Sequence, residues 1–479
     1  MKRIIILFLT VTGLCSCEDF LDTADLVRKN SDNFPLTRVE LENALTGAYA
    51  KLCDVSGQGD CPFFWGAIIS DECFGNGGSG DHNWQSKNQL LRIGENAHSG
   101  AWSANYTGIF RCNSIFQAME THPDIAFPST EDKNQFLGEV YTLRAYYYFN
   151  LALMFGHYIP LRLQPVVENK PAVPAGELYA QIGDDLNNAI ALLPNRSIQA
   201  SGASAQGRFT RWSVQALAAR VFLFYTGYYQ KADLPTRSGS ITKTQVINWL
   251  EDCIANSGHE LLPDYRSNYV YGNHLTAPDY KYASDNRLAW AGDEGGNTEA
   301  VFVIKYSIFN DNRWGLIFGI RSQSRAATFP FRDGWGAASV NPRFFEQWLA
   351  DEPDDIRRNA SILDLSDPAE GLGYSWYIDQ GEETGYVIKK VQYVNAYNAS
   401  GDILNFSLLE YGGNDGQGHS AVDQIMVRFS DVLLMHSELT EDAAGLNRVR
   451  TRVGLPAVPY SPDALRKERR YELAFDGFR

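Results

Sequence analysis

The sequence lacks the motifs of the common hydrolases and metalloenzymes. It contains no GxSxG, HExxH or EF-hand pattern, its 8 histidines are scattered, and no Cys-x-x-Cys or Cys/His spacing suggests zinc. Positive charge is also scarce, because 42 Lys and Arg stand against 57 Asp and Glu and leave a net charge of −15. Nucleic-acid binding needs a basic surface that neutralises phosphates. We therefore expect no metal, no cofactor and no nucleic-acid partner.

One nucleotide-binding pattern is formally present. Residues 75–80 (GNGGSG) satisfy GxGxxG, but no amphipathic helix follows them directly. A dinucleotide site requires that helix, because its N-terminus holds the pyrophosphate. We interpret the stretch as part of a loop-rich region over residues 54–100.

The N-terminus has the pattern of a secretory signal. Residues 1–3 are a short basic segment, residues 4–11 are apolar, and Ser16 directly precedes Cys17. The apolar run is too short to span a bilayer, which predicts a signal peptide over residues 1–16. A plain signal peptide is one interpretation. The other is a lipoprotein signal, because residues 14–17 (LCSC) resemble the lipobox whose last cysteine is lipidated.

The lipobox resemblance implies a lipid on Cys17 and a tether over residues 17–36. Acyl chains on Cys17 would hold the protein at the outer membrane. Glu18 and Asp19 resemble the acidic tag of surface-exposed bacterial lipoproteins. The expected location is therefore the outer membrane, lipid-anchored and facing outward.

The remaining cysteines leave the disulfide pattern open. Of 7 cysteines, Cys15 leaves with the signal and Cys17 carries the lipid, so an odd number is left and at least one thiol stays free. Export permits disulfides. Cys53 and Cys61 bracket a glycine-containing loop and are the preferred pair.

Helical periodicity dominates outside residues 256–340. The clearest helix runs from Phe136 to Phe155, with Gly156 and Pro160 as stop signals. Its consecutive aromatics, residues 146–149, cover every side, which predicts several packing neighbours. Small residues such as Ala219 alternate with bulky ones in another helix, as in stacked helix pairs. Further helices are predicted over residues 37–52, 102–119, 178–193, 210–225, 244–255, 341–349, 424–438, 442–452 and 462–479, and strands over 299–305 and 386–391.

Several motifs resemble, in order, those of the SusD/RagB family, the surface nutrient-binding lipoproteins of Bacteroidetes. In the first third of the chain they are Trp102-x₃-Tyr106-x₂-Ile109-x₃-Asn113 and residues 144–149 (RAYYYF). Toward the end they are residues 428–438 (RFSDVLLMHSE), 447–454 (NRVRTRVG) and 468–479 (ERRYELAFDGFR). The family pattern continues beyond the last motif, so we expect a chain truncated at its C-terminus.

The resemblance implies a mostly α-helical fold. Residues 37–479 would form one SusD-like domain, with a tetratricopeptide-like helical scaffold, a large loop-rich insertion and a few short strands. Such a protein is not an enzyme: it captures a nutrient, most often a glycan, and passes it to a SusC-like TonB-dependent transporter. Two alternatives stay open. One is a peptide-binding RagB-like variant, and the other is a surface glycan hydrolase, which needs two carboxylates across a cleft.

Tryptophans on irregular segments are the predicted ligand contacts. Exposed indoles are costly unless they bind something, although anchoring a loop to the body is an alternative for each. Trp314 ranks first because polar residues surround it, Trp84 ranks second, and Trp335 ranks lower because similar segments occur in family members. The candidates are Trp314, Trp84, Trp290, Trp335, Asn312, Arg313 and Asn83.

Four charged residues lie in apolar helical surroundings: Arg144, Arg428, Glu468 and Arg470. A buried charge is stable only when it is paired. We expect structural ion pairs here in preference to ligand contacts.

Overall fold

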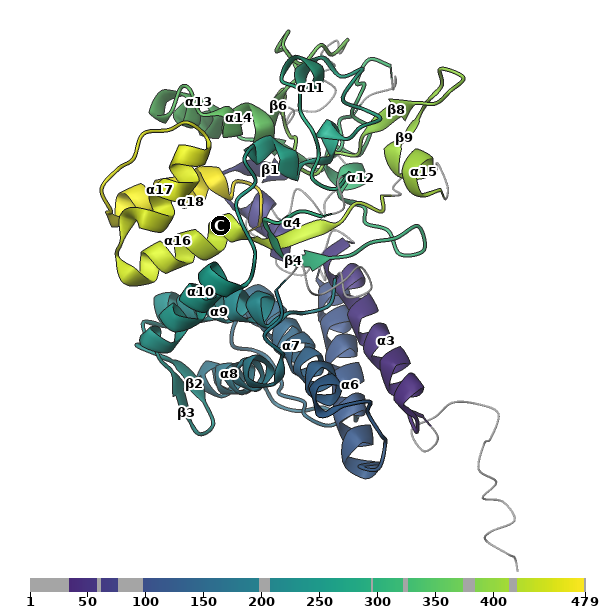
Figure 1. Cartoon of the computed structure of the whole chain (residues 1–479), viewed down its shortest axis with the longest axis vertical. Helices are drawn as coiled ribbons and strands as arrows, with labels where there is room; N and C mark the ends of the chain where they lie inside the picture. The colour runs from purple at the N-terminus through teal and green to yellow at the C-terminus, as the bar shows by residue number, and fades with distance from the viewer. Residues whose placement is uncertain are drawn as a thin grey trace, which may run out of the picture.

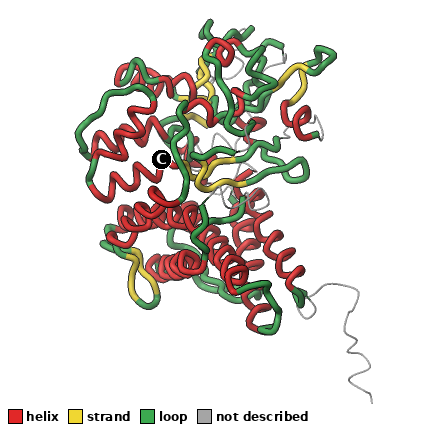
Figure 2. The backbone as a smooth tube through the Cα atoms, viewed as in Figure 1, coloured by secondary structure: helices red, strands yellow, loops and turns green. Residues whose placement is uncertain are grey.

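The computed structural model describes residues 34–57, 62–75, 98–197, 207–293, 296–321, 326–373, 384–412 and 420–477. These ranges are mostly helical and contain five two-stranded antiparallel sheets. Long helices fill the lower part of the molecule, and short elements joined by loops fill the upper part (Figures 1 and 2). The predicted fold class is confirmed.

The lower part is a stack in which each helix packs on the next along the chain. Its members are α3 (Arg38–Gly57), α6 (Ser99–Thr121), α7 (Thr130–Phe155), α8 (Ala175–Leu192), α9 (Arg211–Tyr229) and α10 (Lys243–Asn256). α10 then packs on α16 (Phe429–Thr440), which contacts α17 (Ala443–Arg452) and α18 (Pro462–Glu472). Segments about two hundred residues apart in the sequence thus continue one helical array.

The upper part consists of short elements. Its helices are α4 (Pro62–Ile69), α11 (Lys281–Asp285), α12 (Trp314–Phe318), α13 (Pro342–Asp351), α14 (Ile356–Ser361), α15 (Phe406–Tyr411) and the 3-10 turns η3 (Tyr265–Asn268) and η4 (Val270–Gly272). Its paired strands are β1 (Cys73–Gly75) with β5 (Ala338–Val340), β4 (Ala300–Ile304) with β10 (Gln424–Arg428), β6 (Ile362–Asp364) with β7 (Tyr386–Ile388), and β8 (Asn395–Tyr397) with β9 (Ile403–Asn405). The remaining hairpin, β2 (Leu234–Thr236) with β3 (Gly239–Ile241), packs on α8.

α7 is the centre of the helical stack, and its four aromatics contact four different parts of the fold. The Tyr147 hydroxyl donates to Ala48 O of α3 at 2.7 Å, and Tyr148 donates to Arg162 O at 2.6 Å. The Tyr146 ring lies 5.4 Å from that of Phe302 in β4, and Phe149 meets α9. The helix ends at Gly156, whose φ of 64° suits glycine. The predicted many-sided packing is confirmed.

One predicted helix begins too early. Residues 424–428 form β10, antiparallel to β4, and the helix starts only at Phe429. The segment is buried between two parts of the chain, so pairing with a distant strand overrides its helical periodicity.

The predicted buried ion pairs are present at three of the four positions. Arg144 makes a two-pronged contact with Asp185 of α8, at 2.8 and 2.7 Å. Arg428 reaches Glu299 at 2.9 Å and also pairs with Glu472. Glu468 pairs with Arg357 and Arg450. Arg470 differs, because it is partly exposed and pairs with Asp71 on the surface at 2.9 Å.

The carboxylate of Glu472 sits among three guanidinium groups. Its complete burial raises its pKa, but the charges of Arg452, Arg428 and Arg357 outweigh burial and hold the pKa well below its ordinary value. The cluster joins α18 to the start of β4 and to α14. It therefore fixes the upper part to the end of the helical array.

The preferred disulfide between Cys53 and Cys61 is wrong, because Cys53 is not in a disulfide. It is a free, buried thiol whose Sγ lies 3.4 Å from Lys305 O, and Cys61 lies outside the described residues.

Nothing among the described helices is long and apolar enough to cross a membrane. In the same ranges no group of three or more His, Cys, Asp or Glu is placed to hold a metal ion.

Candidate ligand-binding site

Trp314 lies in the core, so the expectation of an exposed loop indole at this position is wrong. The side chain is 3% exposed and opens the short helix α12. Its ring stacks near Phe64 of α4 and Phe318, with centroids 6.3 and 5.8 Å away. The indole N–H donates to Gln424 Oε1 at 3.0 Å. In this arrangement the ring is packed within the core and not exposed on a loop.

Asn312 and Arg313, beside Trp314, have different surroundings. Asn312 is buried and fastens two segments together, because its Nδ2 donates to Val422 O at 2.8 Å and its backbone N–H to Ser420 O. Arg313 is exposed. Asn312 therefore joins two segments of the fold, whereas the side chain of Arg313 is on the surface.

Among the tryptophan candidates that the structure describes, Trp335 is the most exposed. It is 43% exposed, more than either Trp314 or the half-buried Trp290. Its backbone N–H donates to Leu316 O at 2.6 Å, and the flanking glycines bond to Ile320 O and Gly319 O at 2.9 Å each. These three bonds fix the backbone of Trp335 against α12 and the two residues that follow it.

Both residues that flank Trp335, Gly334 and Gly336, must be glycine for the backbone to lie this close to α12. A Cβ on Gly334 would lie 2.5 Å from the Cα of Gly319, and Gly336 has φ near +60°. Both constraints exclude larger residues. The Gly-Trp-Gly pattern is the sequence signal that places an indole on a tight, rigid turn.

Trp290 packs at right angles to Phe406 at the start of α15, with centroids 5.9 Å apart. Near it, His274 Nδ1 lies 2.9 Å from Asp293 and its Nε2 lies 3.5 Å from Glu410.

The structure does not describe Trp84, Asn83 and Cys17, nor residues 76–80 of the glycine-rich stretch. The predicted candidates are thus split between core, surface and undescribed positions.

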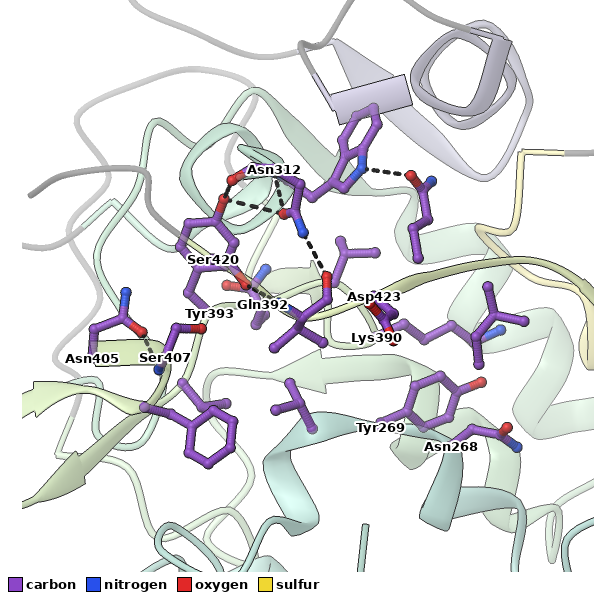
Figure 3. A pocket seen from close by; sticks show the side chains of 18 of the residues that line it. Asn268, Tyr269, Asn312, Lys390, Gln392, Tyr393, Asn405, Ser407, Ser420 and Asp423 are labelled. Atoms are coloured by element: carbon purple, nitrogen blue, oxygen red, sulfur yellow. Dashed lines mark hydrogen bonds between the residues drawn. The ribbon is translucent and has the colours of Figure 1, made fainter. Parts of the chain in front are cut away.

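A polar cavity of about 110 Å³ lies beneath these segments (Figure 3). The predicted residues Trp314 and Asn312 line it, together with Phe406, and the sequence did not reveal this hollow. The other polar lining residues include Asn268, Lys390, Gln392, Asn405, Ser407, Ser420, Asp423, Gln424, Arg428 and Asp476. They come from segments that are far apart in sequence, so no local motif marks them.

The amides of two glutamines in this lining have fixed orientations. Gln392 Nε2 donates to Phe318 O and Ile388 O, at 2.9 and 2.7 Å, so its Oε1 is a spare acceptor. Gln424 Oε1 accepts from the indole of Trp314, which leaves Nε2 as a spare donor. The charged lining residues are paired: Lys390 donates to Ala474 O at 2.7 Å and lies 3.1 Å from Asp476.

The two cavity carboxylates are also engaged. Asp476 pairs with Arg428 at 2.9 Å as well as with Lys390. Burial raises the pKa of Asp423, while its ion pair with Lys305 opposes the rise. Both groups therefore serve as partners of cations within the fold.

Comparison with known proteins finds one family throughout. Residues 19–223 match a SusD-like family model described as "Starch-binding associating with outer membrane". A "SusD-like protein" of Bacteroides ovatus is 26% identical over 188 residues, which are 39% of this chain and 32% of that relative. The first half of this chain is therefore similar to SusD-like proteins. The match spans about a third of the length of that curated relative.

Solved SusD-like and glycan-binding proteins share the fold of this chain. A "Laminarin binding SusD-like protein" is 24% identical, with a TM-score of 0.71 over 92% of this chain and 90% of that one. Surface glycan-binding protein A from Bacteroides thetaiotaomicron, in complex with laminarihexaose, is 20% identical, with a TM-score of 0.71 over 92% and 88%. A SusD homolog from the same species is 19% identical, with a TM-score of 0.68 over 94% and 86%.

Proposed function

We propose that this protein captures a glycan at the bacterial outer membrane and passes it to a SusC-like TonB-dependent transporter. The carrying observation is the exposed indole of Trp335, fixed on α12 by backbone bonds. Relatives with this fold bind laminarin or laminarihexaose by their titles, which supports a β-glucan as the first ligand to try.

Trp335 suits a sugar because a pyranose ring has an apolar face that packs on an aromatic ring. Arg321, whose side chain lies against Gly336, and the exposed Arg313 supply hydrogen-bond donors in the same loop region. A rigid platform loses little conformational freedom on binding, which favours affinity. Trp84, Asn83 and Trp290 remain proposed contributors to the same face.

The hydrolase alternative has weaker support. A glycoside hydrolase needs one carboxyl free to donate a proton and a second free to attack or to activate water. Both carboxylates of the polar cavity are held by cations instead. The peptide-binding alternative shares the aromatic platform and differs in the ligand alone.

The deciding experiment is calorimetry of the purified protein with laminarihexaose, maltohexaose and a mixed decapeptide, followed by chromatography of the sugars. Saturable binding of a sugar without shorter products supports capture. Release of shorter sugars would establish the hydrolase. Binding of the peptide alone would establish the RagB-like variant.

Transfer to a transporter is tested separately. The gene for a SusC-like channel from the same genome would be expressed with this chain, and a tag on the chain used for purification in detergent. A stable complex supports the proposed partner, whereas purification of the chain without the channel contradicts it.

A further inference from the structure

A second hollow lies in the helical half, away from the loop region. It measures about 260 Å³ and is formed between α6 and the segment that joins α7 to α8. From α6 come residues at helical spacing, and from the connecting segment come residues 162–167. The lining is Tyr106, Thr107, Ile109, Phe110, Asn113, Arg162, Gln164, Val166 and Val167. We name this hollow the Arg162 groove.

The backbone of Arg162 is held firmly in this groove. Its N–H donates to the Tyr148 hydroxyl at 2.8 Å, and its carbonyl accepts from Tyr148 and from Asn113 Nδ2, at 2.6 and 2.9 Å. Asn113 is fixed in turn by Arg144 at 2.9 Å. The position of Arg162 is therefore set by α6 and α7 together.

The guanidinium of Arg162, in contrast, has no anionic partner among the described residues. It lies over the ring of Tyr106, 4.7 Å from the centroid, and its Nε is buried without a hydrogen bond. Arg144, one layer deeper, is fully paired with Asp185. The chain as a whole carries a net charge of −15, but this unpaired guanidinium is locally positive. It can therefore bind a carboxylate from another molecule.

The rim of the Arg162 groove is apolar and exposed. Val167 is 90% exposed, Val166 47% and Phe110 41%. Exposed apolar side chains grouped beside a hollow are typical of protein interaction sites. Two of the three rim residues, Val166 and Val167, are branched aliphatic side chains, which suit an apolar protein side chain better than the face of a sugar ring.

The volume of the groove also favours a protein partner. Pockets for whole small ligands measure about 300–1,000 Å³, and this hollow lies at the lower edge of that range. It suits one anchoring side chain from a larger partner, as interface hot spots do.

We propose that the Arg162 groove docks a segment of a partner protein in which a large apolar side chain is next to an Asp or Glu. The apolar side chain fills the hollow between Phe110 and Val167. The carboxylate accepts hydrogen bonds from the Arg162 guanidinium. This surface is separate from the glycan platform on α12.

The test uses an array of immobilised ten-residue peptides with a central Phe-Asp, Phe-Asn, Phe-Lys or Gly-Asp pair in otherwise identical sequences. The intact protein should bind Phe-Asp peptides about tenfold more than Phe-Asn peptides, because a hydrogen bond to a charged group is worth more than a neutral one. Arg162→Gln should remove that preference, and Arg162→Lys should keep part of it. Arg287→Gln, at an exposed position elsewhere, is the matched control.

Equal binding of Asp and Asn peptides by the intact protein, or an unchanged preference in Arg162→Gln, would overturn the proposal. Val167→Asp supplies an independent variant, because Val167 is exposed and its replacement does not disturb the core. It should repel the acidic peptides and lower their signal. Displacement of bound peptide by oligogalacturonate at equal concentration would assign the groove to anionic glycans and also overturn the proposal.

Discussion

At the scale of single residues, the environment of an indole ring decides whether it can bind a ligand. The backbone of Trp335 is fixed and its side chain is exposed, so Trp335→Ala should lower glycan affinity by about 2 kcal/mol, or roughly thirtyfold. Its melting temperature should change little, because few core contacts are lost. Calorimetry with laminarihexaose measures the affinity. Tyr228→Ala, which removes an exposed aromatic from α9, is the control and should bind like the unaltered protein.

Trp314→Ala should show the opposite behaviour. Its removal empties space between Phe64 and Phe318 and leaves Gln424 without its indole donor. A loss of about 3–5 kcal/mol in the free energy of unfolding is expected from such a core truncation. Urea denaturation measures it, and a loss below about 1 kcal/mol would contradict the core assignment.

A buried acid in α7 predicts a pH dependence of stability. Burial raises the pKa of Glu139 to about 7, against the opposing charge of Arg208. An unfolded glutamic acid titrates near 4.3, so between these values the folded state holds a proton that the unfolded state has released. The free energy of unfolding should therefore fall by about 3 kcal/mol as the pH rises from about 4.3 through 7.

Glu139→Gln removes the titrating group and should flatten that part of the stability profile. Urea denaturation at pH 5.5 and pH 8 gives the comparison. Glu177→Gln, at an exposed position of α8, should keep the slope of the unaltered protein. Equal slopes in both variants would show that Glu139 does not titrate in this window.

Residues that form buried ion pairs were easier to predict from the sequence than residues that could contact a ligand. Arg144, Arg428 and Glu468 were predicted to form ion pairs because a charge in an apolar helix must be compensated. The sequence could not tell which of Trp314 and Trp335 is exposed. The exposure of each indole depends on how its segment packs against α4 and α12, and the polarity of neighbouring residues does not predict that packing. The spare amide groups of Gln392 and Gln424 had no local signal at all.

At the scale of elements, the helix boundaries follow from capping residues. Thr210 caps α9 reciprocally with Ser213, and Asn341 caps α13 by accepting from Arg343 N. Such local chemistry is readable from sequence. β10 is not, because its strand conformation depends on pairing with β4 more than a hundred residues earlier.

Helix α9 offers a test of the packing between elements. Ala219 is completely buried in α9, which packs on α8, α10 and α16. Ala219→Phe should overpack these contacts and lower the free energy of unfolding by about 1–3 kcal/mol. Thermal unfolding measures the effect. Leu223→Phe, on a half-buried position of the same helix, should cost less.

At the scale of the whole molecule, the proposed location depends on its lipid. The lipobox resemblance predicts that Cys17 carries the acyl chains that hold the protein on the membrane. Cys17→Ala should move the protein from the membrane fraction to the soluble fraction. Fractionation followed by immunoblotting measures this, with Cys253→Ala as a control that keeps the protein in the membrane. Retention of the Cys17 variant would contradict the lipid anchor.

The guanidinium–carboxylate cluster around Glu472 has a consequence for biogenesis. Glu299 is made 129 residues before Arg428, its partner, and Glu472 follows later still. Until the ribosome has added α18, the buried guanidinium groups of Arg357 and Arg428 lack the carboxylates of Glu468 and Glu472 that pair with them. An interrupted chain would keep the upper half open to proteases, while the early helices α3 to α10 can already stack. Folding of the upper half is therefore expected to wait for α18, whose carboxylates neutralise these buried arginines.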